Sequence, residues 1–216
     1  MFTKYGYSTI GIACIISFLI IISSFFINNN PVKIIFIVVA ALILIFVLNF
    51  FRDPERTPPN RDDVVVSPAD GKVLFVKEID DKKFIKEKSW MISIFMSPLN
   101  VHVNRIPISG TVEYLEYLQG KFVAAFEDKA SDQNERMEIG IQSSIGKVFF
   151  AQVAGMVARR IVNELKLKES VSIGKRFGMI KFGSRVDVIV NSNWKPLVKK
   201  DDKVTAGETI LYELLK

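Results

Sequence analysis

The sequence is poor in the residues that most often build redox and metal sites. Its 216 residues include one cysteine, Cys14, and one histidine, His102. A single thiol excludes an intramolecular disulfide and a thiol-based metal cluster, and the sequence shows no group of His, Cys and carboxylate residues with metal-ligand spacing. We therefore expect no metal ion, and any step that needs an imidazole must use His102.

Charge is also scarce at the start of the chain. Before Arg52 the only charged side chains are Lys4 and Lys33. Residues 52–216 hold 27 of the 29 Lys and Arg residues and all 23 Asp and Glu residues, a net charge of +4. This balance is too weak and too scattered for a nucleic-acid-binding protein, but it suits contact with an anionic membrane surface.

Two uncharged apolar runs, 10–27 and 34–51, predict a membrane helical hairpin. At ~1.5 Å per residue each run forms a helix of ~27 Å, close to the ~30 Å thickness of the hydrocarbon core. The polar segment 28–33 between them contains a helix-stopping proline. Core helices of a soluble protein are the alternative, and a cleaved signal peptide fits poorly because a second apolar run follows.

Basic residues flank the hairpin. They are more numerous at its two ends than in the connecting loop, which has Lys33 alone: Lys4 precedes the first run, and Arg52, Arg56 and Arg61 follow the second. The positive-inside rule then predicts both termini, and the whole soluble part, on the cytoplasmic side of the inner membrane.

From Val64 onward the pattern changes to short segments rich in β-branched and aromatic residues, separated by turn residues. The strands predicted from these segments are 64–66, 72–76, 90–95, 111–118, 147–153 and 185–190. The segment 156–166 is either a strand or a strand that continues into a helix. The tail 199–210 has the turn-strand rhythm of barrel-sandwich hybrids such as lipoyl domains. We predict a hairpin over 1–51, a proline-rich linker over 52–63, and a mostly β, barrel-sandwich-hybrid-like domain with a few helices over 64–216.

Two apolar-alternating segments within 177–190 are interrupted by Gly183 and Ser184, the local pattern of two strands that meet at a tight turn. Glycine can adopt a positive φ and leave its carbonyl open to attack. The serine supplies a hydroxyl directly after that carbonyl. Such a pair on its own most often marks a simple hairpin turn.

Five groups of residues, in sequence order, resemble phosphatidylserine decarboxylase proenzymes and cover nearly all of the predicted soluble domain. They are Phe51-Arg52-Asp53-Pro54, Ser67-Pro68-Ala69-Asp70-Gly71, Met96-Ser97-Pro98-Leu99-Asn100-Val101-His102-Val103-Asn104-Arg105, Lys129-Ala130-Ser131 with Asn134-Glu135-Arg136, and Phe182-Gly183-Ser184. The short chain, and Gly-Ser-Arg where longer members have Gly-Ser-Thr, resemble the compact prokaryotic subgroup.

The resemblance implies a carboxy-lyase that makes phosphatidylethanolamine with a pyruvoyl cofactor. Decarboxylation of an amino acid needs an electron sink that no side chain supplies, and the sequence shows no recognisable pyridoxal phosphate site. As in the family, Ser184 Oγ would attack the Gly183 carbonyl to form an ester. β-Elimination would then split the chain into 1–183 and 184–216 and leave a pyruvoyl group at position 184. Its ketone would form an imine with the amine of the phosphatidylserine headgroup.

A serine hydroxyl needs a base, and the resemblance offers His102 and Asp70 as partners of Ser184. Taken alone, Asp70 indicates a turn-capping carboxylate and His102 a histidine held by a backbone carbonyl. Longer members carry two histidines in this loop, and Arg105 stands where the second one falls. Either His102 serves both self-cleavage and later proton delivery, or one of these steps uses water or another group.

Other features leave alternatives open. Arg159-Arg160 and Lys166 with Lys168 either bind the lipid phosphate or form a solvated basic face. The competing functions are a membrane-anchored lipoyl- or biotinyl-like carrier or adaptor without catalysis, and a pyruvoyl enzyme for another amine. A carrier needs an exposed lysine at a hairpin tip, which we do not find. The expected partners are membrane phosphatidylserine and the two chains of the proenzyme itself; a homo-oligomer stays open.

Overall fold

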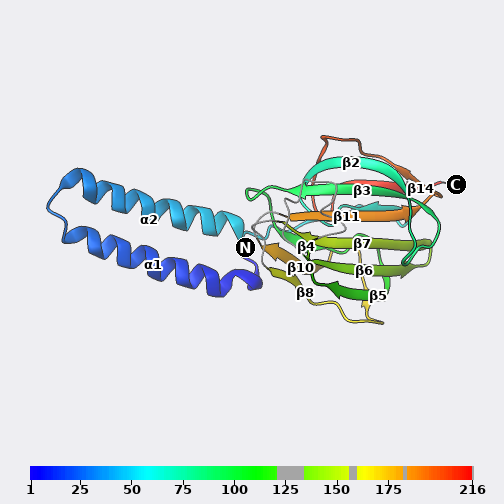
Figure 1. Cartoon of the computed structure of the whole chain (residues 1–216), viewed down its shortest axis with the longest axis horizontal. Helices are drawn as coiled ribbons and strands as arrows, with labels where there is room; N and C mark the ends of the chain where they lie inside the picture. Colours follow the sequence, from blue (N-terminus) through cyan, green and yellow to red (C-terminus); the bar gives the residue numbers. More distant parts are fainter. Residues whose placement is uncertain (121–133, 156–159, 182–183, 216) are drawn as a thin grey trace. The chain divides into compact units, whose positions relative to one another are not determined.

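The computed structural model describes residues 1–120, 134–155, 160–181 and 184–215. The chain forms two compact units, Met1–Glu55 and Arg56–Lys216. In Figure 1 the first unit consists of two long helices and the second of β-strands. The predicted fold class, a mostly β domain preceded by two long apolar helices, is confirmed, but the few helices expected within 64–216 are not found among the described residues.

The helical unit begins with a short 3-10 turn, η1 (Lys4–Gly6), followed by α1 (Tyr7–Phe25) and α2 (Asn30–Phe50). The Asn29 side chain accepts a hydrogen bond from Val32 N at 3.3 Å and so caps α2. Small residues let the helices approach: Ser17 on α1 and Ala40 on α2 are fully buried, and Ser17 Oγ donates to Ala40 O at 3.3 Å. Both helices are long and apolar enough to cross a membrane, which makes them compatible with membrane association.

The β unit contains fourteen strands within the described ranges. They are β1 (Val64–Val66), β2 (Gly71–Asp80), β3 (Lys88–Met96), β4 (Val103–Arg105), β5 (Gly110–Leu118), β6 (Arg136–Ser143), β7 (Gly146–Ala154), β8 (Arg160–Asn163), β9 (Ser170–Val171), β10 (Arg176–Lys181), β11 (Ser184–Asn191), β12 (Trp194–Pro196), β13 (Lys203–Val204) and β14 (Ile210–Leu214). Each of the six predicted strands is found, most of them longer than predicted. In the ambiguous segment, residues 160–163 are a strand and 156–159 lie outside the described residues.

These strands form one large curled sheet and two small sheets in the described part of the chain (Figure 1). The large sheet has the order β13-β2-β3-β11-β7-β6-β5-β9, and the small ones have the orders β4-β10-β8 and β1-β14-β12. The pairings are antiparallel, with register shifts in β2 and β5. A register shift of this kind bends a strand, which helps the large sheet to curl.

The strand β11 lies near the middle of the large sheet, between β3 and β7, and it is buried on both faces. On its inner face Val186, Val188 and Val190 belong to the main hydrophobic core. On its outer face Ile189 packs in a smaller cluster with Phe84, Ile85, Met91 and Phe149. The strand that starts with Ser184 is therefore held from both sides of the sheet.

The predicted tight turn between two strands at Gly183-Ser184 is wrong in one respect. Both strands exist, but β10 pairs with β4 and β8, whereas β11 pairs with β3 and β7. Phe182 and Gly183 lie outside the described residues. Because β10 and β11 belong to different sheets and do not pair with each other, these two strands do not form a hairpin.

Candidate functional site

Ser184 is the first residue of β11, at the point where the chain leaves the β4-β10-β8 sheet. It pairs with Met96 of β3 and with Ala154 of β7, and it is fully buried. Its hydroxyl donates to Met96 Sδ at 3.3 Å. A thioether is a weak acceptor, so this contact leaves the serine oxygen less firmly held than a bond to a carbonyl would.

A chain of buried amides lies beside Ser184. Asn104 of β4 donates from Nδ2 to Pro68 O at 3.3 Å and approaches Met96 Sδ at 3.8 Å. Its Oδ1 accepts a hydrogen bond from Gln152 Nε2 at 2.9 Å. Gln152 lies on the inner face of β7, two residues from Ala154, and both amide side chains are fully buried. These contacts connect the turn at Pro68, the strand β4, the strand β7 at Gln152, and Met96, which is one of the two neighbours of Ser184.

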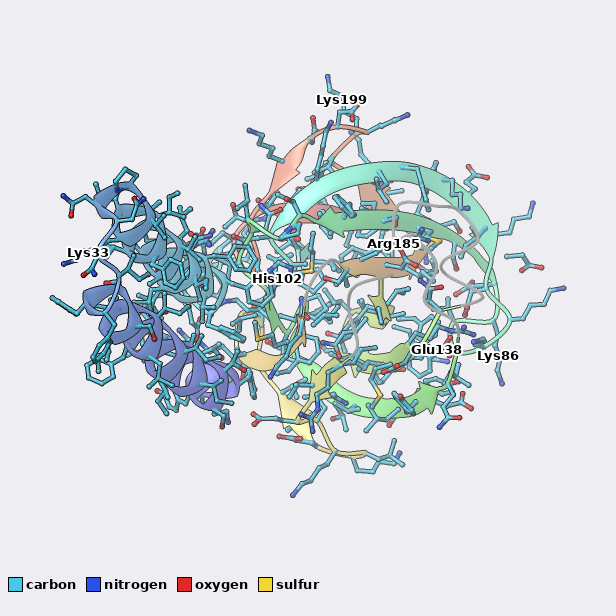
Figure 2. All side chains as sticks on the ribbon, turned by 60° about the vertical axis from the view of Figure 1, so that its left-hand side comes forward. Lys33, Lys86, His102, Glu138, Arg185 and Lys199 are labelled. Atoms are coloured by element: carbon cyan, nitrogen blue, oxygen red, sulfur yellow. The ribbon has the colours of Figure 1, made fainter. Side chains whose placement is uncertain are left out.

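His102, labelled in Figure 2, directly precedes β4 and is fully buried. Its backbone oxygen accepts a hydrogen bond from Ile180 N at 3.4 Å, which places it beside β10, the strand that leads to the Gly-Ser pair. Its ring Nδ1 lies 3.0 Å from Asn100 O. Since a carbonyl oxygen only accepts, Nδ1 carries the proton, and a neutral imidazole then has its basic lone pair on Nε2.

Asp70 lies in the turn just before β2, and its carboxylate holds two other segments of the chain. Its Oδ2 accepts from Arg56 Nη2 at 3.0 Å, and its Oδ1 accepts from Ala206 N at 2.8 Å. The same turn reaches β4, because Pro68 O accepts from Arg105 N at 2.9 Å as well as from Asn104. The structure thus links Asp70 to the segment that carries His102 through this turn.

Three further residues of the family-like motifs hold the backbone around the site. Arg105 is buried, and its Nη1 donates to Gly174 O at 2.9 Å, on the loop that precedes β10. Asn134 Nδ2 donates to Ala154 O at 2.7 Å, and Ala154 N donates to Glu135 O at 2.9 Å. Since Ala154 pairs with Ser184, Asn134 and Glu135 fix one of the two neighbours of the serine.

The cations predicted for the lipid phosphate are only partly described. Arg159 lies outside the described residues, as do Gly183 and the Lys129-Ala130-Ser131 group. Arg160 on β8 is opposite Lys181 on β10, and burial, together with the charge of Arg160, lowers the pKa of Lys181. Lys166 and Lys168 are exposed, and Lys168 Nζ lies 3.4 Å from Glu113 Oε1.

Within the described ranges, no three His, Cys, Asp or Glu residues are grouped so that they could hold a metal ion.

Sequence reasoning did not single out Gln152, Arg56 or Asn104 as parts of the site. Asn104 was quoted within a motif but given no role, and its contact with Gln152 depends on how β4 lies against β7. The sequence does indicate that Gln152 is unusual, because it is a polar residue at an inward-facing position of the otherwise apolar strand β7. A buried amide at such a position usually has a specific hydrogen-bond partner.

Comparisons with known proteins point to one family. Residues 43–212 match the family model described as phosphatidylserine decarboxylase. A protein of Chlorobium luteolum is 54% identical over 166 residues, which cover 77% of this chain and 78% of that protein. A protein of Chlorobium limicola is 48% identical over 212 residues, which cover 98% of this chain and 99% of that one. Both relatives are named phosphatidylserine decarboxylase proenzyme.

Proposed function

The chain belongs to the phosphatidylserine decarboxylase family of carboxy-lyases, in its short bacterial form, and we propose that it decarboxylates phosphatidylserine with a pyruvoyl group made from its own Ser184. The observation that carries this proposal is the position of that serine. It is a fully buried hydroxyl at the crossing between two sheets, directly after Gly183.

The surroundings of Ser184 fit a pyruvoyl group. Such a group is no larger than the serine from which it derives, so it would fill the same space between Met96 and Ala154. Burial keeps bulk water away from the ketone, and the group supplies the electron sink that side chains lack. The residues around it would exclude water and hold position 184 in the sheet.

Self-cleavage would begin with Ser184 Oγ. The hydroxyl attacks the Gly183 carbonyl, the peptide C–N bond breaks, and an ester remains. Loss of the α-proton of residue 184 and of the Cβ–O bond then releases the carboxylate of Gly183 and leaves dehydroalanine, which water converts to the ketone and ammonia. We assign the proton transfers to His102 through Nε2, because Asn100 O fixes the proton on Nδ1. The same imidazole would deliver the proton that replaces CO2 on the substrate carbon.

Asp70 would act mainly as a positioning residue. Its carboxylate is shared between Arg56 and the backbone of Ala206, and its turn holds the β4 segment through Pro68 O. A direct relay of Asp70, His102 and Ser184 stays a prediction from the family resemblance. Asn104 would support Met96, one of the two neighbours of the serine, and Gln152 would hold Asn104 in place.

The helical unit would anchor the enzyme at its lipid substrate. We propose that the hairpin of 1–51 lies in the inner membrane and that the linker 52–63 leads to a cytoplasmic catalytic domain, 64–216, which self-cleavage divides into two chains. A reporter fused to the C-terminus should be active only in the cytoplasm. Activity of a periplasmic reporter at this position would reverse the assigned orientation.

The decisive experiment compares the purified wild-type chain with Ser184→Ala in detergent. The wild type should run as two chains on a denaturing gel. The small chain should have the mass of 184–216 less one ammonia, react with hydroxylamine and resist N-terminal sequencing. Ser184→Ala should stay intact and release no CO2 from phosphatidylserine vesicles. Ser192→Ala, which removes an exposed hydroxyl from the same region, is the control and should behave as wild type. An intact wild-type chain that is fully active would refute the mechanism.

A further inference from the structure

A buried group of charges lies on the outer face of the large sheet, directly beside Ser184 in sequence. The Arg185 side chain is fully buried and makes two contacts with Asp187 of the same strand, Nε to Oδ1 at 2.7 Å and Nη2 to Oδ2 at 3.1 Å. Ser93 on β3 donates from Oγ to Asp187 Oδ1 at 2.6 Å. The guanidinium also lies over the ring of Phe75 on β2, 5.2 Å from its centre. Figure 2 labels Arg185 on β11.

These contacts connect three adjacent strands in a fixed register. Asp187 is paired directly with Ser93, and Ser93 with Phe75, so the group extends from β11 across β3 to β2. The two-pronged contact of Arg185 with a carboxylate is geometrically demanding, and lysine does not reproduce it. A buried charge must also keep its partner, because an uncompensated one is strongly unfavourable. The group therefore resists any slip of β11 along β3.

Self-cleavage would make it more important that β11 does not slip along β3. In the intact chain, Ser184 is joined through residues 182 and 183 to the strand β10, which belongs to another sheet. After the cut, residue 184 becomes a chain end, and chain ends fray unless they are tied down. Arg185 and Asp187 are then the second and fourth residues of the small chain, on the face opposite to that of Ser184.

We propose that Arg185, Asp187 and Ser93 form a clamp that holds the new N-terminus of the small chain in register after self-cleavage, so that the carbonyl group at position 184 stays within reach of the substrate amine. The three are positioning residues, since their side chains lie on the outer face of the sheet. This inference rests on the proposed function, because it needs a cut between 183 and 184.

Hydrogen exchange measured by mass spectrometry on the full-length protein in detergent tests the clamp. Arg185→Lys keeps the charge but loses the fork. In the cleaved protein it should speed exchange of the amides of 185–188 by about tenfold or more, as expected for loss of charged hydrogen bonds. In the uncleaved Ser184→Ala background the same substitution should change exchange of these amides far less. In the cleaved enzyme kcat should fall while KM stays nearly constant.

The controls separate a clamp from a general loss of stability. Ile189→Ala removes a buried side chain from the same face of β11 and should weaken the fold without selectively freeing 185–188 in the cleaved form. Ser93→Ala removes one hydrogen bond from the clamp and should speed exchange of 185–188 in the cleaved protein by a smaller factor than Arg185→Lys does. It therefore still tests the clamp if Arg185→Lys does not fold. Equal exchange in cleaved and uncleaved backgrounds would show an ordinary structural ion pair and overturn the clamp alone. A wild-type chain that is never cut would overturn both the clamp and the proposed function.

Discussion

The pair of buried amides, Asn104 and Gln152, gives the sharpest test of how the site is built. We consider two substitutions that keep the side-chain size, Asn104→Leu and Gln152→Met, singly and together. Asn104→Leu removes the acceptor of the 2.9 Å bond from Gln152 Nε2 and the donor of the 3.3 Å bond to Pro68 O. Pro68 O keeps its bond from Arg105 N, but among the described residues Gln152 Nε2 retains a single long contact of 3.5 Å, to Val162 O.

The expected loss in the free energy of unfolding follows from a difference between making a buried hydrogen bond and leaving a buried polar group without one. A neutral bond contributes about 1 kcal/mol net, whereas a buried polar group left without its partner costs about 1–3 kcal/mol. Asn104→Leu loses two bonds and deprives one buried donor of its main partner, so the free energy of unfolding should fall by about 2–4 kcal/mol. Gln152→Met removes the Nε2 donor that Asn104 Oδ1 accepts from and should cost about 1–3 kcal/mol. The double variant replaces both partners by apolar groups and should lose less than the sum.

The assay is urea unfolding of the full chain in detergent, with every variant built on Ser184→Ala so that a single uncut polypeptide unfolds. The double-mutant cycle should give a coupling energy of about 1 kcal/mol or more between Asn104 and Gln152. In chains that keep Ser184, the single variants should also cleave themselves more slowly, because Asn104, which contacts Met96 beside the serine, is either removed or less firmly held.

Strict additivity of the two substitutions would refute the coupling. A measured coupling without any change in the self-cleavage rate would separate the amide pair from the reaction and reduce it to an element of the fold.

Two further substitutions test the backbone of the site and its pH dependence. Asn134→Ala removes the 2.7 Å bond to Ala154 O. It should lower the free energy of unfolding by about 1–3 kcal/mol, measured by unfolding curves, and slow self-cleavage at Ser184, measured by the time course of chain separation. Unchanged cleavage would contradict a role of Asn134 in holding the site. The pKa of Lys181 lies below its ordinary value of 10.5 because of burial and Arg160, so the native state releases this proton before the unfolded chain does. The free energy of unfolding should therefore rise with pH between the lowered pKa and 10.5, and this rise should be absent in Lys181→Met. Arg160→Gln should raise the pKa of Lys181 in an NMR titration. An unchanged pKa would show that burial alone lowers it.

Much of the architecture could be predicted because it depends on local properties of the chain. The two apolar runs gave both helices, although α1 and α2 begin at residues 7 and 30, earlier than the predicted 10 and 34. The extra residues, such as Tyr7 and Pro31, are compatible with a helix start but are not part of an apolar run. Six strands followed from β-branched segments in the same way. The eight-residue strand β6 was not predicted, and short strands such as β4 and β13 carry too few residues to show a period.

The sequence by itself determined both long helices, several of the strands and the family, and it singled out Ser184 as the proposed reactive residue, because composition, periodicity and motif order are all properties of neighbouring residues. Only the tertiary structure decided that Ser184 lies at a crossing between sheets, since antiparallel strands pair with partners that are distant in sequence. For the same reason it alone placed Gln152 against Asn104, and Arg185 in a buried ion pair on the outer face. Strand pairing brings these side chains together, and no local pattern encodes which strands will pair.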